Sequence, residues 1–226
     1  MPTDKQTWEN WFRDVWADRE DRVYRELFGD IGNAIHTIPS VLFERMGFKH
    51  VDERWLVHGV FESAPNETHK SWLYVTSSLS NPWGADPETI DPTQPSGLGF
   101  ELVLQTPRQE SWAIQVLHWL MAIQILAASG MVKGDTVQLH DRVPLQTSID
   151  PATESAMRHL IICEPEPFAK QFGLPSGTVD LLLCVGMTDA ENEFAREHGA
   201  LPLLQLLREQ TDFPVTDSSR TSVQLP

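Results

Sequence analysis

The sequence predicts an α+β domain, and three segments carry that prediction. Residues 98–106 alternate between apolar and other side chains, as in a strand with one strongly apolar face. Residues 178–187 are continuously apolar, which is typical of a central strand buried on both faces. Residues 111–129 are apolar almost all round, which favours a helix covered on several sides. The chain has 226 residues, 41% of them hydrophobic, and can therefore bury one sizeable core.

The first 30 residues predict an amphipathic helix packed on the domain. Thr3 fits the N-cap of a capping box with Gln6, and Gly29 ends the helix. The apolar residues recur at helical spacing and include three tryptophans, Trp8, Trp11 and Trp16. We expect these tryptophans to dock onto the core. The alternative is that they form a partner surface.

Strand patterns and a long loop follow. Residues 36–50 stay ambiguous, and we expect strands over 53–63 and 71–80. Residues 81–96 are rich in proline and acidic residues, without helical or strand periodicity. A loop of this length inside a domain is more often functional than idle.

The second half predicts further strands near 136–140 and 157–163, with a loop over 164–177. Thr188 and Glu191 form a second capping box, which opens a helix that ends at Gly199. A further helix follows, with Pro202 in its first turn. The polar residues at the end of the chain are expected to fray. We divide the chain into the helix of 1–30, a domain of 31–212 and a tail of 213–226.

The charge balance limits the classes of partner. The chain has 32 acidic and 17 basic residues, a formal net charge of −15. Nucleic-acid binding depends on basic residues that neutralise phosphates, so we expect no direct nucleic-acid binding. The acidity fits plain solubility or a basic protein partner. The N-terminus lacks the features of a signal peptide, and polar residues interrupt the apolar segment 111–129, so we expect a cytoplasmic protein without a membrane span.

The sequence contains no motif of a known catalytic site. None of the eight histidines forms the paired pattern of a zinc protease, and no phosphate-binding or nucleophile-elbow motif occurs. Cys163 and Cys184 lie in apolar strand patterns, where thiols pack as small hydrophobic groups. We therefore expect no catalytic residue, no metal and no cofactor.

Two groups of acidic residues allow alternatives. Glu101 lies mid-strand, where we expect it to accept structural hydrogen bonds. The alternative is a hydrolase that uses Glu101 as a base with His58 or His118. The acidic residues of the long loop lack the spacing of an EF-hand, which favours a solvated loop over a calcium site.

Several strings resemble the Suppressor of fused family. The most specific is PSGLGFEL, from Pro95 to Leu102. SWLYVTSSLSNPWG, KGDTVQLH, RHLIICEPE and VDLLLCVGMTDAENEFAREHGALPLLQLL are similar in order and spacing, so the resemblance covers roughly residues 55–207. It implies a mixed, largely antiparallel sheet flanked by helices, in an α/β sandwich.

The resemblance also implies a protein-binding function and no enzyme activity. Animal members bind and restrain zinc-finger transcription factors of Hedgehog signalling. Short, acidic, single-domain members look bacterial, and for these the family implies immunity proteins that neutralise polymorphic toxins. In animal members an acidic residue just ahead of the Pro-Ser-Gly turn contributes to partner binding. Gln94 stands immediately before Pro95 in this chain, so that contact does not carry over directly.

Our leading hypothesis is a cytoplasmic inhibitor or immunity protein that binds another protein, such as a basic toxin domain, and is a monomer or weak homodimer. The expected contact surface is the loop of residues 81–94. Its candidate partner-binding residues are Tyr74, Trp83, Asp86, Glu88 and Asp91. The family signature, expected to be mainly structural, is Pro95, Ser96, Gly97, Gly99, Phe100 and Glu101. A homo-oligomeric scaffold with the first helix as its interface is a further alternative.

Overall fold

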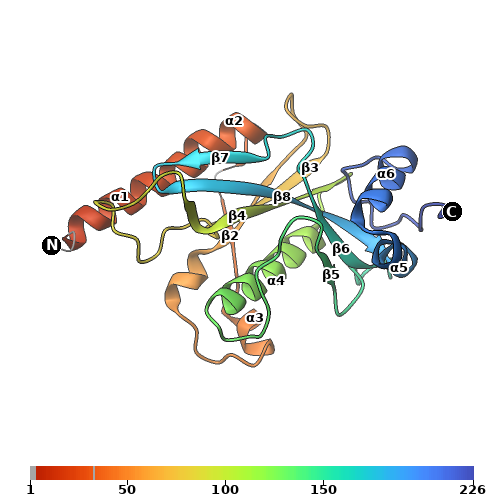
Figure 1. The fold of residues 1–226 in the computed structure, drawn as a ribbon, viewed down its shortest axis with the longest axis horizontal. Coiled ribbons are helices and arrows are strands. Elements are labelled where there is room, and N and C mark those ends of the chain that lie inside the picture. Colours follow the sequence, from red (N-terminus) through yellow and green to blue (C-terminus); the bar gives the residue numbers. More distant parts are fainter. Residues whose placement is uncertain (1–3, 33) are drawn as a thin grey trace.

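In the computed structural model, which describes residues 4–32 and 34–226, a mixed eight-stranded sheet lies between two layers of helices (Figure 1). The strand order is β1-β2-β3-β4-β8-β6-β5, and β7 pairs with β8 beside this path. Among the described residues only β4 and β8 pair in parallel, which confirms the predicted, largely antiparallel sheet. The strands are β1 (His36–Thr37), β2 (Gly59–Ser63), β3 (Trp72–Ser77), β4 (Pro95–Thr106), β5 (Arg142–Pro144), β6 (Met157–Cys163), β7 (Gln171–Leu174) and β8 (Gly177–Thr188).

The helices cover both faces of the sheet. One core is formed between the sheet and the helices α3 and α4, and a second core involves α1, α2, α5 and α6. The helices are α1 (Lys5–Ala17), a π-helical segment (Asp18–Val23), α2 (Tyr24–Phe28), α3 (Ser40–Arg45), a 3₁₀ turn (Glu53–Val57), α4 (Ser111–Ala128), α5 (Asp189–His198) and α6 (Ala200–Gln210).

Successive side chains of the central strand β4 point into two different cores. Phe100, Leu102 and Leu104 belong to the core under α4, and Val103 belongs to the core on the opposite face. Both faces are buried because helices cover both, so Glu101 is also fully enclosed, on the same side of the strand as Val103.

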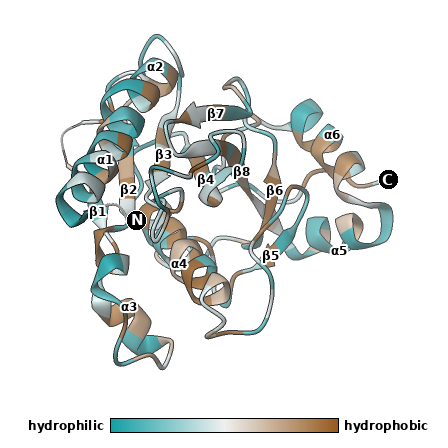
Figure 2. Cartoon of the chain, turned by 60° about the vertical axis from the view of Figure 1, so that its left-hand side comes forward, coloured by the Kyte–Doolittle hydropathy of each residue, from teal (hydrophilic) through white to brown (hydrophobic). Residues whose placement is uncertain are grey.

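Helix α4 is the central helix of one layer. Its 18 residues are long enough and on average apolar enough to cross a membrane, but 61% of them are buried inside the protein. Figure 2 shows it as a mainly hydrophobic helix beside the sheet, whereas α1 and α5 carry hydrophilic residues as well. The structure therefore agrees with a buried core helix.

The N-cap of the first helix lies one residue after the predicted one. Asp4 is the N-cap and accepts hydrogen bonds from the backbone N–H groups of Gln6 and Thr7. Thr3, the expected cap, lies outside the described residues. Helical backbone continues through the π-helical segment and α2 to Gly29, whose φ of +76° ends the helix as predicted.

Three predicted elements need correction. Residues 53–57 form a 3₁₀ turn capped by Asp52, and strand β2 begins only at Gly59. Residues 136–140 are not a strand. The Val137 N–H bonds to the side chain of Gln124, and the His140 N–H, at the end of the segment, bonds to the Ile162 carbonyl of β6. The predicted loop of 164–177 contains β7, which forms a hairpin with β8.

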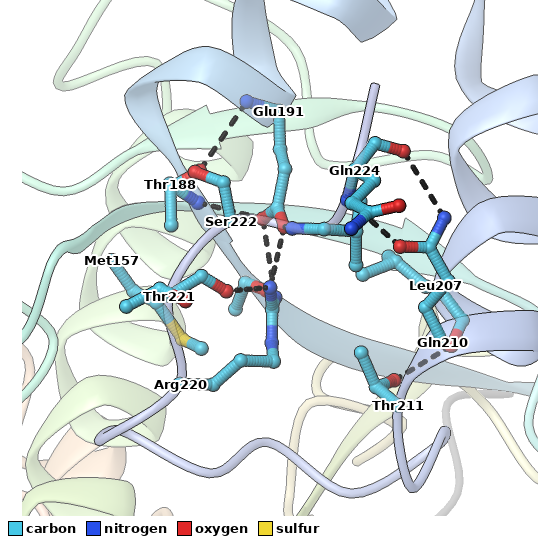
Figure 3. A network of polar contacts seen from close by, with 12 residues as sticks. Met157, Thr188, Glu191, Leu207, Gln210, Thr211, Arg220, Thr221, Ser222 and Gln224 are labelled. Carbon is cyan, nitrogen blue, oxygen red and sulfur yellow. Dashed lines mark hydrogen bonds and ion pairs between the residues drawn. The ribbon is translucent and has the colours of Figure 1, made fainter. Parts of the chain in front are cut away.

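The C-terminal tail is held down, so the prediction that it frays is wrong. Arg220 forms an ion pair with the fully buried Glu191 (Figure 3). The Val223 N–H donates to the same carboxylate at 2.9 Å. Glu191 also completes the predicted capping box with Thr188. Thr216 is 1% exposed, and its hydroxyl accepts a hydrogen bond from the Gly186 N–H at 3.0 Å. The domain boundaries at 30 and 212 stay a prediction.

Candidate functional site

The candidate site is built on the tight turn that follows β3. Ser78 adopts a φ of +103°, which is strained for a residue with a side chain. One oxygen of Glu101, Oε1, accepts hydrogen bonds from the Ser78 N–H at 3.0 Å, the Ser80 N–H at 2.9 Å and the Ser80 hydroxyl at 2.6 Å. The other oxygen accepts from the Thr76 hydroxyl at 2.6 Å. Glu101 therefore fixes the turn, in the manner expected of a structural acceptor.

A buried arginine reaches the same turn from the N-terminal helix. Arg19, on the π-helical segment, is 0% exposed. It donates to the Ser80 hydroxyl at 3.1 Å and to Asn81 Oδ1 at 2.7 Å. Burial raises the pKa of Glu101, and the charge of Arg19 and the surrounding donors act in the opposite direction. The Ser80 hydroxyl accepts a hydrogen bond from Arg19 and donates one to Glu101. It therefore bridges the buried guanidinium and the buried carboxylate.

The two Pro-Ser-Gly strings of the sequence meet beneath this turn. The hydroxyls of Ser96 and Ser176 are 2.6 Å apart, and the Ser96 hydroxyl donates to the Ser80 carbonyl at 2.7 Å. A Cβ at Gly97 would lie 2.6 Å from the Asn81 carbonyl oxygen, and one at Gly177 would lie 2.3 Å from the Gln94 carbonyl oxygen. Only glycine permits these approaches. The repetition of the string at residues 95–97 and 175–177 is the sequence signal that could have indicated this contact.

The remaining signature residues lie around the same point. Pro95 starts β4 and is exposed, while Gly99 has a φ of +84°. Phe100 is 5% exposed and packs in the core under α4. The signature thus lies where β4 enters the sheet beside β8.

Residues 81–94, which we call the acidic loop, leave the turn as a chain of local hydrogen-bonded bends. Asp86 accepts from the Glu88 N–H at 3.1 Å, and Asp91 accepts from the Thr93 N–H at 2.9 Å. Hydrogen bonds from Thr93 lower the pKa of Asp91, so it stays ionised at neutral pH. Glu88 and Asp91 are exposed. The loop therefore presents fixed negative charge at the surface.

Trp83 ties the acidic loop to the N-terminal helix. Its ring lies 4.3 Å from the ring of Phe12 and 6.2 Å from that of Trp8, measured between centroids. The Trp8 indole donates to the Ala85 carbonyl at 2.9 Å, and Arg54 lies over the Trp83 ring at 5.5 Å. We expected the tryptophans of the first helix to dock onto the core. Trp11 packs against the core that involves α1, whereas Trp8 docks onto the acidic loop.

The expectation that Tyr74 anchors a partner is wrong. Tyr74 is 0% exposed in the core under α4, and its hydroxyl accepts the Glu110 N–H at 2.6 Å. Its position in β3 turns it toward the core, because side chains alternate between the two faces of a strand and both faces are covered here. Burial raises the pKa of Tyr74.

A pocket of about 300 Å³ opens at the base of the acidic loop, against the end of α4. Its polar walls come from His58, Asn81 and Ser129. Burial lowers the pKa of His58 to about 4, so this imidazole is neutral at pH 7. The apolar walls are Trp55, Leu79, Trp83, Gly97, Leu98, Ile125 and Ala128. The pocket can accept a neutral group and offers it hydrogen bonds.

The hydrolase alternative finds no geometry to support it. Glu101 is enclosed and already accepts four hydrogen bonds. His58 bonds through Nδ1 with the Arg54 carbonyl, and His118 bonds through Nε2 with the His36 carbonyl, so neither is oriented by Glu101. Both cysteines lie on the neighbouring strands β6 and β8, and burial raises the pKa of Cys163 to about 12. Within residues 4–32 and 34–226, no cluster of three potential metal ligands occurs.

The protein is an α+β sandwich. Its acidic loop starts at a turn that is fixed by the buried hydrogen bonds among Glu101, Ser80 and Arg19. The chain belongs to the Suppressor of fused family, because the family model described as Suppressor of fused protein (SUFU) matches residues 55–221. The comparison with curated proteins gives no match.

Solved structures share the fold. A SUFU homologue from Neisseria gonorrhoeae has a TM-score of 0.61 at 16% identity, covering 96% of this chain and 99% of that one. Drosophila Suppressor of Fused has a TM-score of 0.57 at 22% identity, covering 74% of this chain and 42% of that one. A chain of a Sufu–Fu complex has a TM-score of 0.56 at 21% identity, covering 74% of this chain and 76% of that one. The Neisseria likeness extends beyond residues 55–221 and therefore beyond the segment that the family model matches.

Proposed function

We propose that this chain is a non-enzymatic protein-binding domain that restrains one partner, as a bacterial cytoplasmic inhibitor or immunity protein. Membership of the Suppressor of fused family carries the proposal. One solved relative was determined in a complex, Sufu with Fu. The two buried, unpaired cysteines on adjacent strands are compatible with a reducing compartment.

We place the contact surface on the acidic loop. Glu88 and Asp91 are exposed there, and the whole chain has a formal net charge of −15. Negative charge on a loop steers a basic partner and favours its correct orientation. A basic toxin domain, for example a nuclease, is the partner class that fits this charge.

The loop is also well supported for binding. Trp83 is held between Phe12 and Arg54, and the Ala85 carbonyl is held by Trp8. A loop fixed before binding loses little conformational entropy when it meets a partner. The half-buried Trp83 supplies an aromatic group at the edge of the surface, as binding hot spots often do.

Affinity capture from the native cells tests this proposal. The bait is the full chain, compared with a loop variant that combines Glu88→Lys with Asp91→Asn. A control variant combines Glu197→Lys with Glu209→Gln, which changes the net charge equally on α5 and α6, at the other end of the molecule (Figure 1). We expect one basic protein to be captured by the wild type and the control, and at least tenfold weaker binding to the loop variant.

The captured protein then decides the biological role. Its expression alone should arrest growth, and co-expression of the wild-type chain should restore growth. Equal capture by the loop variant would move the contact surface away from residues 81–94. A captured partner without toxicity would refute the immunity role while leaving protein binding in place.

A further inference from the structure

Helix α1 carries two apolar stripes that contact different parts of the molecule. Trp11 and Val15, about one helical turn apart, pack in the core that involves α1, α2, α5 and α6. Trp8 and Phe12 have the same spacing and form a second stripe. Their rings lie against Trp83 of the acidic loop. The first stripe therefore holds the helix to the domain, and the second holds the acidic loop to the helix.

Phe12 lies at the centre of a separate aromatic cluster. Its ring centroid is 4.9 Å from that of Trp8, 4.3 Å from that of Trp83 and 6.3 Å from that of Trp16. Phe12 is 7% exposed, yet within the described part of the chain neither Phe12 nor Trp83 belongs to either of the two cores. The burial of Phe12 therefore depends on the acidic loop lying on helix α1.

Hydrogen bonds inside the acidic loop close single bends. The Ala85 N–H donates to the Pro82 carbonyl at 3.2 Å, and the Thr89 N–H donates to the Asp86 carbonyl at 3.0 Å. The bond from the Trp8 indole to the Ala85 carbonyl instead joins residues that are 77 apart in the sequence. A surface segment with few buried apolar contacts opens locally at a low free energy. We therefore expect the aromatic cluster and this indole bond to decide how often the acidic loop keeps its shape.

The shape of the loop matters for binding, because the apparent affinity scales with the fraction of molecules that are ready to bind. A loop that holds the bound shape only about one tenth of the time binds its partner about tenfold more weakly. Loosening the loop leaves the charges of Glu88 and Asp91 in place but lets their positions vary. A loss of shape and a loss of charge can therefore be told apart by measurement.

We propose that Phe12 and Trp8 are positioning residues of the binding site, which hold the acidic loop in the shape that presents Glu88 and Asp91 to the partner. This inference rests on the proposed function. Both residues precede the segment 55–221 that the family model matches. The affinity for the partner is thus controlled from a helix outside that segment, by residues that touch the loop and leave the partner uncontacted.

Hydrogen exchange of the ¹⁵N-labelled full chain, measured by NMR without a partner, tests the positioning role directly. Phe12→Ala should speed the exchange of the Ala85 and Thr89 amides about tenfold, because the loop opens more often. Val15→Ala is the matched control on the same helix, since Val15 is 1% exposed in the other stripe. It should lower the free energy of unfolding in urea and leave the exchange of these two loop amides unchanged.

The captured basic partner supplies a second measurement. In Phe12→Ala the apparent dissociation constant should rise about tenfold with an unchanged salt dependence, because the loop keeps its charges. The variant that combines Glu88→Lys with Asp91→Asn should instead weaken the salt dependence itself. Phe12→Leu restores apolar volume and should return both exchange and affinity toward wild type. Trp8→Phe keeps a ring but removes the donor to the loop, so both should change by about threefold.

The inference and the proposed function fail in different experiments. Wild-type exchange of the loop amides in Phe12→Ala would show that the loop is fixed by its own bends, and would overturn the positioning role. An unchanged affinity in Phe12→Ala, with binding lost in the Glu88 and Asp91 variant, would overturn it as well and leave the contact surface in place. Retained capture by the Glu88 and Asp91 variant would instead refute the contact surface of the proposed function.

Discussion

The N-terminal helix and the C-terminal tail are each held to the domain by an arginine with little exposed surface, but through different chemistry. Arg220 donates directly to the carboxylate of Glu191, and both partners are secluded, with side chains 14% and 0% exposed. Arg19 has no direct contact with the buried Glu101 and reaches it through the hydroxyl of Ser80. The tail is held by a direct ion pair with further hydrogen bonds around it, whereas the arginine of the helix acts only through hydrogen bonds to the turn.

The difference separates a structural contact from a candidate site. Glu191 has its hydrogen bonds completed by Thr188, Arg220 and Val223. The Arg19 network instead includes a strained Ser78 and leaves several N–H groups unpaired. Strain and unpaired polar groups cost stability and concentrate at functional sites. We therefore expect binding near the turn after β3, and we expect the contact of Glu191 with the tail to be structural.

The largest effect is expected at the tail. Glu191→Gln should lower the free energy of unfolding by about 3 kcal/mol, because it removes the buried carboxylate that pairs with the largely enclosed Arg220. Urea denaturation measures the loss, and hydrogen exchange should show reduced protection near Val223. Glu193→Gln, on the same helix but exposed, is the control. If Glu191→Gln loses no more free energy of unfolding than Glu193→Gln does, the tail is held by packing and not by the ion pair.

The second-largest effect is expected from acid, which should lower the free energy of unfolding through His58. The pKa of His58 is about 4 in the folded state and 6.5 in the unfolded chain. The unfolded state therefore binds more protons between these values, so stability is present above pH 6.5 and falls as the pH drops to 4. The loss from this group reaches about 3 kcal/mol. Relative to wild type, His58→Gln should gain stability by this amount from pH 7 to pH 4 in urea titrations. Parallel curves for the two proteins would contradict a neutral, buried His58.

Local patterns could be read from the sequence, whereas long-range polar contacts could not. The alternation of β4, the apolar α4 and the Thr188–Glu191 capping box each depend on residues near one another in the chain. Strand β7 was missed because its four residues include Gly173 and are organised by the hairpin with β8. Only part of the site could be predicted from the sequence. The acidic loop and Glu101 have local sequence signals, whereas Arg19 has none.

The missing half of the site depends on distant partners. Arg19 bonds to Ser80, 61 residues away, and in the sequence it is one charged residue among several on a helix. Nothing local distinguishes it from Arg22, which lies one turn further on and pairs with Asp18 at the surface. The same applies to Arg220 and Glu191, which are 29 residues apart. Burial of charge follows from the tertiary fold and leaves no periodic pattern.

The pair Arg19 and Arg22 therefore gives the sharpest comparison within one helix, with the smallest expected effects. Arg19→Met should cost about 1–3 kcal/mol, because Asn81 Oδ1 and the Ser80 hydroxyl lose their donor inside the protein. This is less than the loss at Glu191, since Glu101 keeps its four hydrogen bonds to the turn. Arg22→Gln should cost only about 0.5 kcal/mol, as for exposed ion pairs in general.

Stability alone does not reveal the role of Arg19, so the same variants are compared by the Asn81 side-chain amide signal. In Arg19→Met the amide loses the donor that fixes its orientation, and the Asn81 signal should shift or broaden. In Arg22→Gln it should stay in place. An unchanged Asn81 signal in Arg19→Met would mean that the turn is fixed by Glu101 alone. The two ends of the chain would then be fastened alike, each by one buried carboxylate.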